Sequence, residues 1–419
     1  MPISIKKFPR AIIHIDGDSF FASCEMVRRP DLRGKAVVTG YERGIATAMS
    51  AEAKRLGVTR GMPVYKIKRE FPSVIILSSD YESYALYSKR MNDIVRRYTN
   101  DVEEYSVDEC FADITGLRRS LRMSYPDIAK AIKHDLQEEL GLTFSVGLSV
   151  NKVLAKVASR WQKPDGFTSI PGYKIEEHIR ELAVKDIWGI GPNTSIYFEK
   201  LGVRTALQLV KKSPEFIKTY LTKPTIEIWR ELRGEFVLHL NTEKKSEYKS
   251  IMKTQTFTPA SEDRDLIFAE LSSNIELACS RLRHHKLYTK EIIFYLKGQD
   301  FRHYSIEIEL PASVCVPEKI IEVVKNNFSK VYKERKFYRA TGIIFKKITT
   351  WESTTADLFG EFEKGEKINR IYDEIDALAL KFGRSVVGLG SSVKKEKRSH
   401  VYKKFSMRLL PLPLLGKVS

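Results

Sequence analysis

The stretch that decides the fold is HIDGDSFF at residues 14–21, which directly follows the apolar residues 11–13. An apolar run that ends in small and polar residues is typical of a buried strand that enters a turn. Asp16 and Asp18 place two carboxylates there, and burial of unpaired carboxylates is costly, so a compensating charge such as a divalent metal ion is needed. The alternative is a capped turn, in which the second acid or the serine after it caps a helix from Phe20 to Met26.

Length, charge and cysteine content bound the class of the protein. At 419 residues the chain is too long for one ordinary domain, and roughly three are expected. Lys and Arg number 71 against 53 Asp and Glu, and the net charge of +18 favours a polyanionic partner, nucleic acid or an anionic membrane surface. No apolar run approaches the ~20 residues of a membrane span, and no signal peptide is recognised. Four scattered cysteines without a CxxC pair argue against zinc and favour a reduced, cytoplasmic protein, so nucleic acid is the favoured partner.

A second acidic pair lies further along the chain. An amphipathic helix is predicted from Tyr81 to Tyr98, followed over residues 102–114 by two strands that meet at a tight turn with Asp108 and Glu109 at its tip. Acids on a hairpin tip are usually only solvated, but here apolar residues flank them. Residues 142–148 predict another strand, followed by a helix with a basic face. This alternation, without a phosphate-binding glycine loop, favours an α+β sheet with helices on one face.

Residues 168–240 are predicted to be helical and separate. Within them the hairpin IWGIG at residues 187–191 lies between two helices, and Gly189 and Gly191 would let a phosphate oxygen approach backbone N–H groups at a helix N-terminus. The pattern, with its trailing Leu-Gly-Val at residues 201–203, resembles a helix-hairpin-helix module that binds the DNA backbone. The alternative is an ordinary glycine-rich turn.

Later segments add a basic cluster and a tail. Arg281 and Arg283 precede a predicted strand at residues 292–296, and next to a DNA-backbone module we expect them to contact phosphates. After Trp351 the chain becomes tail-like, with one amphipathic stretch from Ile368 to Phe382 and a basic segment near the end.

Four blocks in a fixed order resemble the Y-family translesion DNA polymerases: Asp16-Gly17-Asp18-x-Phe20-Phe21, Ser106-Val107-Asp108-Glu109, Ser149-Val150-Asn151-Lys152 with Lys156, and the helix-hairpin-helix. Each motif alone is weak, but the ordered set is specific. The resemblance implies an α+β multidomain fold shaped as a right hand. Its parts would be a palm (1–18 and 81–167), small fingers (19–80), a helical helix-hairpin-helix thumb (168–240), a linker (241–246), an α/β little finger (247–352) and a tail (353–419).

The resemblance also implies a two-metal site for joining a primer 3′-hydroxyl to an α-phosphate. Two Mg²⁺ ions can stabilise the attacking and leaving oxygens, and Mg²⁺ prefers oxygen ligands. Asp16 and Asp108 match the bridging ligands, Glu109 the ligand of the primer-side ion, and the Gly17 carbonyl a ligand of the triphosphate-side ion. Without metals the three acids would repel one another. Asp18 is not a ligand in the family pattern and is expected to be structural.

The nucleotide site follows from the same resemblance. Phe21 matches the steric gate that excludes a ribose 2′-hydroxyl, the alternative being core packing, which we expect in part for Phe20. The backbone amides from Ser19 to Phe21 would face the triphosphate. Lys54 and Lys156 match positions that neutralise the β- and γ-phosphates.

One departure from the family lies in the fingers. The chain reads SAEAK at residues 50–54, where the family usually reads SYEAR, so Ala51 replaces a tyrosine and Lys54 an arginine. A lysine lacks the bidentate fork of arginine, so nucleotide affinity is expected to be lower unless another residue substitutes. Residues 46–55 are rich in small side chains and are predicted to form a helix that ends at Gly57.

The tail carries a short peptide, Thr355 to Phe359, in which Leu358 and Phe359 resemble the apolar anchor that docks bacterial polymerases on the sliding clamp. Chance remains an alternative for so short a match. The expected partners are primer-template DNA, deoxynucleoside triphosphates and this clamp, with no membrane, and the chain is expected to be a monomer.

The leading hypothesis is a DNA-directed DNA polymerase that carries out low-fidelity translesion synthesis in DNA repair with two Mg²⁺ ions. Two alternatives stay open from the residues alone. One is a metal-dependent nuclease or nucleotidyl cyclase on a related palm, since both cluster acids similarly. The other is a catalytically silent DNA-binding relative.

Overall fold

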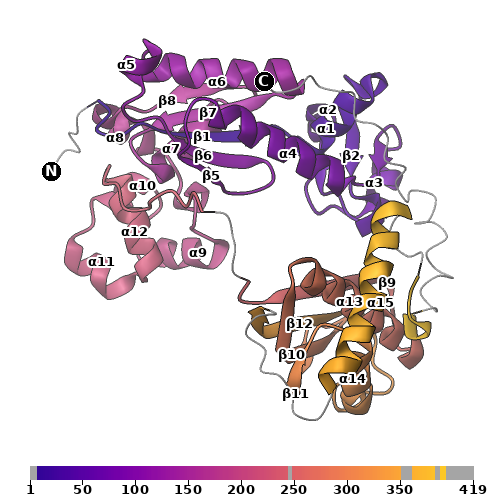
Figure 1. The fold of residues 1–419 in the computed structure, drawn as a ribbon. Coiled ribbons are helices and arrows are strands. Elements are labelled where there is room, and N and C mark those ends of the chain that lie inside the picture. Colours follow the sequence, from indigo (N-terminus) through magenta and orange to yellow (C-terminus); the bar gives the residue numbers. More distant parts are fainter. Residues whose placement is uncertain (1–6, 244–247, 351–360, 383–386, 393–419) are drawn as a thin grey trace. The chain divides into compact units, whose positions relative to one another are not determined.

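The computed structural model describes residues 7–243, 248–350, 361–382 and 387–392 (Figure 1). The chain divides into two compact units, residues 1–244 and 245–419. None of the helices in these described ranges is long and apolar enough to cross a membrane.

A five-stranded sheet with the order β5-β6-β1-β7-β8 forms the centre of the first unit. Every residue of β1 is buried, since this strand lies in the middle and pairs antiparallel with both β6 and β7. The strands are β1 (Ile12–Gly17), β5 (Val102–Glu104), β6 (Glu109–Asp113), β7 (Phe144–Ser149) and β8 (Phe167–Ser169). The helices of these segments are α4 (Tyr81–Arg96), α5 (Arg118–Leu121), α6 (Tyr125–Leu140) and α7 (Lys152–Trp161).

Helices cover both faces of this sheet, so the expectation of helices on one face is wrong. Ile13 and Ile15 pack in one core cluster with side chains of α4 and α6. Ile12, on the other face, packs with Ala155 of α7. Alternate residues of a strand point to opposite faces. Both sets are buried in β1, Ile13 and Ile15 on one face and Ile12 with His14 on the other, so each face has its own cover of helices.

The segment predicted as fingers forms a small three-stranded sheet with the order β3-β2-β4. Its elements are α1 (Phe20–Arg28), η1 (Pro30–Leu32), β2 (Val37–Thr39), η2 (Tyr41–Arg43), β3 (Ala48–Met49), α2 (Ala51–Arg55), α3 (Val64–Glu70) and β4 (Ile75–Leu77). The predicted helix over residues 46–55 is therefore wrong in its first half, where the chain enters β3. Its end is as expected, because Gly57 has φ +99° directly after the C-cap Leu56.

The segment predicted as thumb is helical and shares a core with α7. Asn151, the N-cap of α7, donates hydrogen bonds from its side-chain amide to the carbonyls of Glu231 and Glu235, both at 2.7 Å. The segment predicted as thumb is therefore joined to α7 at this cap. Its elements are η3 (Gly172–Lys174), α8 (Ile175–Ile179), η4 (Val184–Asp186), α9 (Pro192–Lys200), α10 (Ala206–Val210), α11 (Pro214–Tyr220) and α12 (Lys223–Leu232).

The second unit is a four-stranded antiparallel sheet with the order β11-β10-β12-β9. Its helices share one core with the strands and lie on one side of the sheet in Figure 1. The amphipathic stretch predicted in the tail belongs to a helix, α15, and its Tyr372 is buried in this core. The elements are β9 (Ile251–Ser261), α13 (Arg264–His284), β10 (Leu287–Gly298), β11 (His303–Val314), α14 (Pro317–Val331), β12 (Tyr338–Thr350) and α15 (Glu361–Phe382). The limits of the domains stay predictions.

Candidate active site

The register of β1 and β6 brings the three predicted acids to one end of the central sheet. Asp16 lies directly opposite Glu109, and the backbone N–H of Gly17 donates to the carbonyl of Asp108 at 2.8 Å. A slip by one residue would turn Asp16 to the other face of the sheet. Strand pairing therefore holds the three carboxylates near one another.

Two lysines engage these carboxylates. Lys163 forms an ion pair with Asp16, and Lys156 forms one with Glu109 at 2.5 Å. Burial raises the pKa of Asp16 to about 6, against the opposing attraction of Lys163. Burial opposes ionisation of Glu109, but the hydrogen bond and charge of Lys156, together with the His14 ring 3.7 Å away, lower its pKa to about 2.

The third acid lies in the turn between β5 and β6. The side chain of Asp108 is partly exposed and accepts a hydrogen bond from the Ser106 hydroxyl at 2.7 Å. The backbone N–H groups of Tyr105 and Ser106 donate to the carbonyl of Glu109 at 3.2 and 3.0 Å and close the turn. The predicted hairpin is thus present, with Glu109 as the first residue of β6.

The donor set fits a hard divalent cation. In the described ranges no group of three or more His, Cys, Asp or Glu is arranged as a ready metal site. The carboxylates of Asp16 and Glu109 nevertheless lie opposite each other on paired strands. The Lys163 ammonium occupies the position at Asp16 that a metal ion could take. Carboxylate oxygens are the ligands that Mg²⁺ prefers, so the site fits such ions once this lysine moves aside.

Asp18 has the structural surroundings expected of it. Its carboxylate accepts hydrogen bonds from the Ser145 hydroxyl and the backbone N–H of Asp165, both at 2.8 Å, and it is only 5% exposed. The capped-turn alternative is wrong in its detail, because Ser19 is the N-cap of α1 with φ 50° and makes no side-chain cap hydrogen bond. Instead the Ser19 hydroxyl accepts a hydrogen bond from Lys54 at 2.9 Å.

The two adjacent phenylalanines have different surroundings. Phe20 is 3% exposed and belongs to the core. Phe21 is only partly buried and stacks on Tyr84, with ring centroids 4.4 Å apart, while Tyr81 meets it edge-on at 5.6 Å. A Cβ at Gly17 would lie 2.7 Å from the Phe20 ring, so the turn before these residues requires glycine.

The lysines differ from the expectation. Lys156 is 3% exposed and engaged with Glu109, so in this arrangement it is not open to a triphosphate. Lys163 is one-third exposed, and sequence reasoning missed it. The signal was the KPDG turn at residues 163–166, directly after the helix with the basic face. Lys54 and Ala51 are both exposed on α2.

His14 was also missed as a site residue. It is fully buried, its Nδ1 lies 2.7 Å from the Ser159 hydroxyl, and its Nε2 lies 3.7 Å from Glu109. Burial lowers the pKa of His14 to about 4, so the imidazole is neutral at pH 7. Its place next to Glu109 could be derived from the strand alternation of residues 14 and 16.

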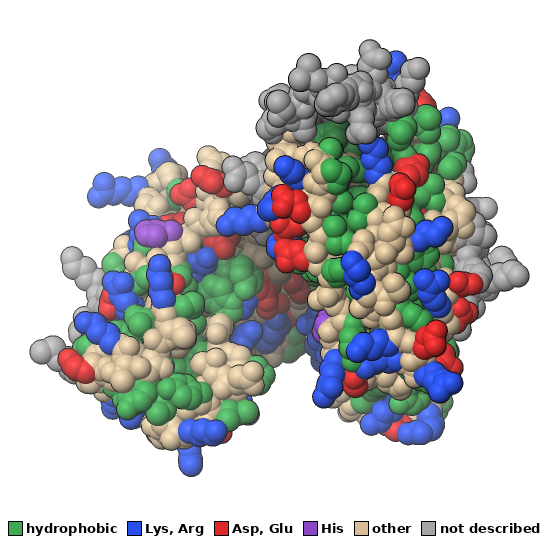
Figure 2. Space-filling view, turned by 90° about the horizontal axis from the view of Figure 1, so that it is seen from below, with side chains coloured by type: hydrophobic (Ala, Val, Ile, Leu, Met, Phe, Trp, Pro, Cys, Tyr) green, Lys and Arg blue, Asp and Glu red, His purple; other side chains and the backbone are tan. Residues whose placement is uncertain are grey.

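The glycine hairpin has an open approach. A Cβ at Gly191, the N-cap of α9, would meet no atom within 4 Å. Gly189 has φ +86°, and a Cβ there would lie 2.6 Å from Ile228. Both its backbone conformation and its close packing against Ile228 therefore require glycine. Figure 2 shows Lys and Arg side chains spread over the visible surface of both units.

In the second unit one predicted DNA contact is not exposed. Arg283 donates to Asp376 of α15 through Nε at 2.8 Å and Nη2 at 2.9 Å, and its side chain is 8% exposed. The expected contact of Arg283 with phosphate is therefore wrong in this arrangement, because the tail helix occupies the guanidinium. Arg281 is exposed.

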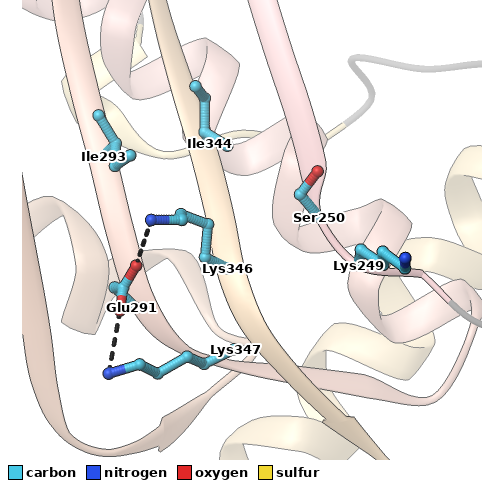
Figure 3. Close-up of a pocket in the computed structure, with 7 residues that line it drawn as sticks. All are labelled: Lys249, Ser250, Glu291, Ile293, Ile344, Lys346 and Lys347. Carbon is cyan, nitrogen blue, oxygen red and sulfur yellow. Dashed lines mark ion pairs between the residues drawn. The ribbon is translucent and has the colours of Figure 1, made fainter. Parts of the chain in front are cut away.

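A pocket on the sheet of the second unit gathers lysines that sequence reasoning did not single out (Figure 3). Glu291 pairs there with Lys346 at 2.7 Å and Lys347 at 3.0 Å, and the hydrogen bond from Lys346 leads in lowering the pKa of Glu291 to about 2. Lys249 also lines the pocket. The predicted clamp residues Leu358 and Phe359 lie outside the described residues.

Comparison with known proteins agrees with this geometry. Residues 15–160 match the impB/mucB/samB family, and residues 248–358 match the C-terminal domain of that family. The chain is 32% identical over 336 residues to DNA polymerase IV of Bacteroides fragilis strain YCH46, covering 80% of this chain and 92% of the relative. It is 30% identical over 393 residues to DNA polymerase IV of Bacillus velezensis, covering 92% and 94%.

Solved structures share the fold. A Y-family DNA polymerase chimera of Dbh and Dpo4 has a TM-score of 0.70 at 23% identity, covering 81% of this chain and 99% of the chimera. An insertion ternary complex of Dbh DNA polymerase has a TM-score of 0.52 at 22% identity, with the same coverage. The predicted α+β multidomain polymerase fold, shaped as a right hand, is thereby confirmed. The chain belongs to the impB/mucB/samB family of Y-family polymerases and is a DNA-directed DNA polymerase.

Proposed function

We propose that the chain extends a primer past damaged template bases by two-metal nucleotidyl transfer. The observation that carries the proposal is the β1–β6 register, which sets Asp16 opposite Glu109 and next to Asp108. Polymerisation needs carboxylates at one place for two cations, and these are the acids that the sheet gathers.

The acids have distinct tasks in this proposal. When bound, two Mg²⁺ ions stabilise the attacking and leaving oxygens of the displacement. Asp16 and Asp108 would hold both ions, Glu109 the primer-side ion, and the Gly17 carbonyl the triphosphate-side ion. His14 beside Glu109 is neutral at pH 7. It therefore adds no positive charge that would compete with the cation for this carboxylate.

Lysines supply charge for the triphosphate. Lys163, freed from Asp16 when cations bind, lies on a partly exposed turn and can turn toward phosphate oxygens. Lys54 contacts the Ser19 hydroxyl, next to the amides proposed to face the triphosphate. These two cations compensate for the lost tyrosine at Ala51 and for Lys156, which is occupied by Glu109.

The aromatic cluster supports a gate for the sugar. Phe21 is stacked on Tyr84 at 4.4 Å, and a ring held in this way can exclude a 2′-hydroxyl by contact. Replacement Phe21→Ala should admit ribonucleotides. Unchanged sugar discrimination would show that another group guards the pocket.

Features of the fingers, the glycine hairpin and the lysine pocket support lesion tolerance and DNA binding in this proposal. A Cβ at Gly44 in the fingers would meet no atom within 4 Å, which supports a roomy roof over the nascent pair. The open hairpin at Gly191 and the lysine pocket of the second unit suit phosphates of primer-template DNA. A role in DNA repair in the cytoplasm, as a monomer with a sliding clamp, belongs to the same proposal.

Primer extension tests it. The full chain is given Mg²⁺, the four deoxynucleoside triphosphates, and undamaged or abasic templates. We expect extension on both templates and loss of at least about 10³-fold in Asp108→Asn. Asp31→Asn, a surface acid on η1, is the matched control and should extend normally. Failure of the wild type, undiminished extension by Asp108→Asn, or degradation of labelled primer without nucleotides would contradict the proposal, the last in favour of a nuclease.

A further inference from the structure

Trp188, in the glycine hairpin, contacts the turn that carries the catalytic acids. Its indole N–H donates to the Tyr105 hydroxyl at 2.9 Å, and the two rings meet edge-on with centroids 5.4 Å apart. Its ring also lies 5.7 Å from that of Phe111, on β6. A residue beside the candidate DNA-backbone glycines thus lies against the active-site turn.

Tyr105 is connected to Glu109 by two routes. Its backbone N–H donates to the Glu109 carbonyl at 3.2 Å. Its ring covers the Lys156 ammonium at 4.5 Å, and the same ammonium pairs with the Glu109 carboxylate at 2.5 Å. A cation over an aromatic face is attracted to it. Whatever fixes the Tyr105 ring therefore restrains both the backbone and the side chain of a predicted metal ligand.

Ordinary core packing does not account for this contact. Trp188 is partly buried and packs at the edge of two core clusters, but Tyr105 is 42% exposed, so core packing does not fix the Tyr105 ring. The indole and hydroxyl satisfy each other although water could reach the tyrosine. Since an aromatic pair with a hydrogen bond fixes both distance and orientation, the contact is suited to positioning.

We propose that Trp188 is a positioning residue for the polymerase reaction. It acts through Tyr105 to hold the turn of Asp108 and Glu109 in the geometry that binds the primer-side cation. Trp188 lies between Ile187 and Gly189, so DNA bound at the hairpin would also stabilise the contact of Trp188 with Tyr105. DNA binding and alignment of the acids are then coupled. This inference rests on the proposed function.

The test is single-nucleotide insertion by the full chain on undamaged primer-template at saturating DNA. Trp188→Phe keeps a ring but loses the donor, and Tyr105→Phe loses the acceptor. We expect each to lower the maximal insertion rate about tenfold and to raise the Mg²⁺ concentration for half-maximal rate, since one lost hydrogen bond of about 1.4 kcal/mol is tenfold. The nucleotide KM, the DNA Kd and the melting temperature should change little. The double variant should be no worse than either single one.

Matched controls are Trp161→Phe and Tyr173→Phe, both at exposed positions (48% and 56%); these should insert at the wild-type rate. Additive losses in the double variant, unchanged rates and Mg²⁺ dependence, or a loss confined to DNA affinity would each overturn the positioning role. Absence of insertion by the wild type would instead overturn the proposed function and, with it, this inference.

Discussion

Two acid–lysine clusters in this chain use the same residue types in different surroundings. In the first unit Asp16 lies in packed protein beside Lys163, and burial raises the pKa of Asp16 to about 6. In the second unit Glu291 is as little exposed, at 7% against 6% for Asp16, but it pairs with both Lys346 and Lys347, and its pKa falls to about 2. Two lysines thus satisfy Glu291, whereas a single lysine satisfies only in part an acid that has Glu109 and Asp108 as neighbours. Asp16 is therefore the acid that would gain from a further cation, which is what the proposed metal site needs.

The largest difference between the clusters is expected in catalysis. Asp16→Asn should lower single-turnover insertion by about 10³-fold, because the proposed bridging ligand of the two cations is lost. Glu291→Gln, the matched change in the second unit, should leave the rate within about threefold. The measurement is rapid-quench insertion at saturating DNA and Mg²⁺. Equal losses in the two variants would erase the distinction.

The lysines should differ next. Lys163→Ala should raise the nucleotide KM about 30-fold, because the proposed charge-assisted contact to phosphate, of about 2 kcal/mol, would be removed. Its control is Lys133→Ala, which removes a cation that pairs with Asp165 of the same turn without facing Asp16. A normal KM in Lys163→Ala would mean that this lysine only neutralises Asp16.

Stability without metal should respond to pH with opposite signs. The folded-state pKa of Asp16 is raised, so the folded chain holds its proton more tightly, and stability falls as pH rises from about 4 through 6. Asp16→Asn should therefore stabilise the chain in EDTA by on the order of 2 kcal/mol at pH 7.5 and by less at pH 5. The pKa of Glu291 is lowered, so its contribution is present above about pH 4.5 and is lost as pH falls through about 2. Glu291→Gln should thus destabilise the chain equally at pH 7.5 and pH 5. Melting curves at both pH values check this, and a stabilisation by Asp16→Asn that grows toward pH 5 would contradict it.

The smallest effect concerns DNA affinity. Removing both Lys346 and Lys347 should weaken DNA binding about threefold at moderate salt and reduce the slope of log Kd against log salt by about 1 to 2. Removal of Lys319 and Lys325, both exposed on α14, changes the charge equally outside the pocket and serves as the control in a fluorescence anisotropy titration over salt. A slope that stays the same would show that this pocket does not meet phosphates.

Much of the site was accessible from sequence because motif order carries it. Asp16, Asp108 and Glu109 were predicted to meet, and strand register accounts for their meeting. The partners of these acids were not predictable in the same way. Lys163 reaches Asp16 from a turn after α7, and Arg283 is covered by Asp376 of a helix far along the chain. Such pairings depend on packing of distant elements, which neither periodicity nor motif spacing records.

Gly17 has a consequence for how this enzyme can change over evolution. A side chain there would collide with the Phe20 ring at 2.7 Å, and Phe20 is followed directly by the proposed gate Phe21. A substitution that moves Phe20 is therefore expected to shift the proposed gate as well. If Gly17 and Phe21 have the proposed roles, mutations at position 17 would alter metal binding and sugar selection together. The two properties would then change as one unit.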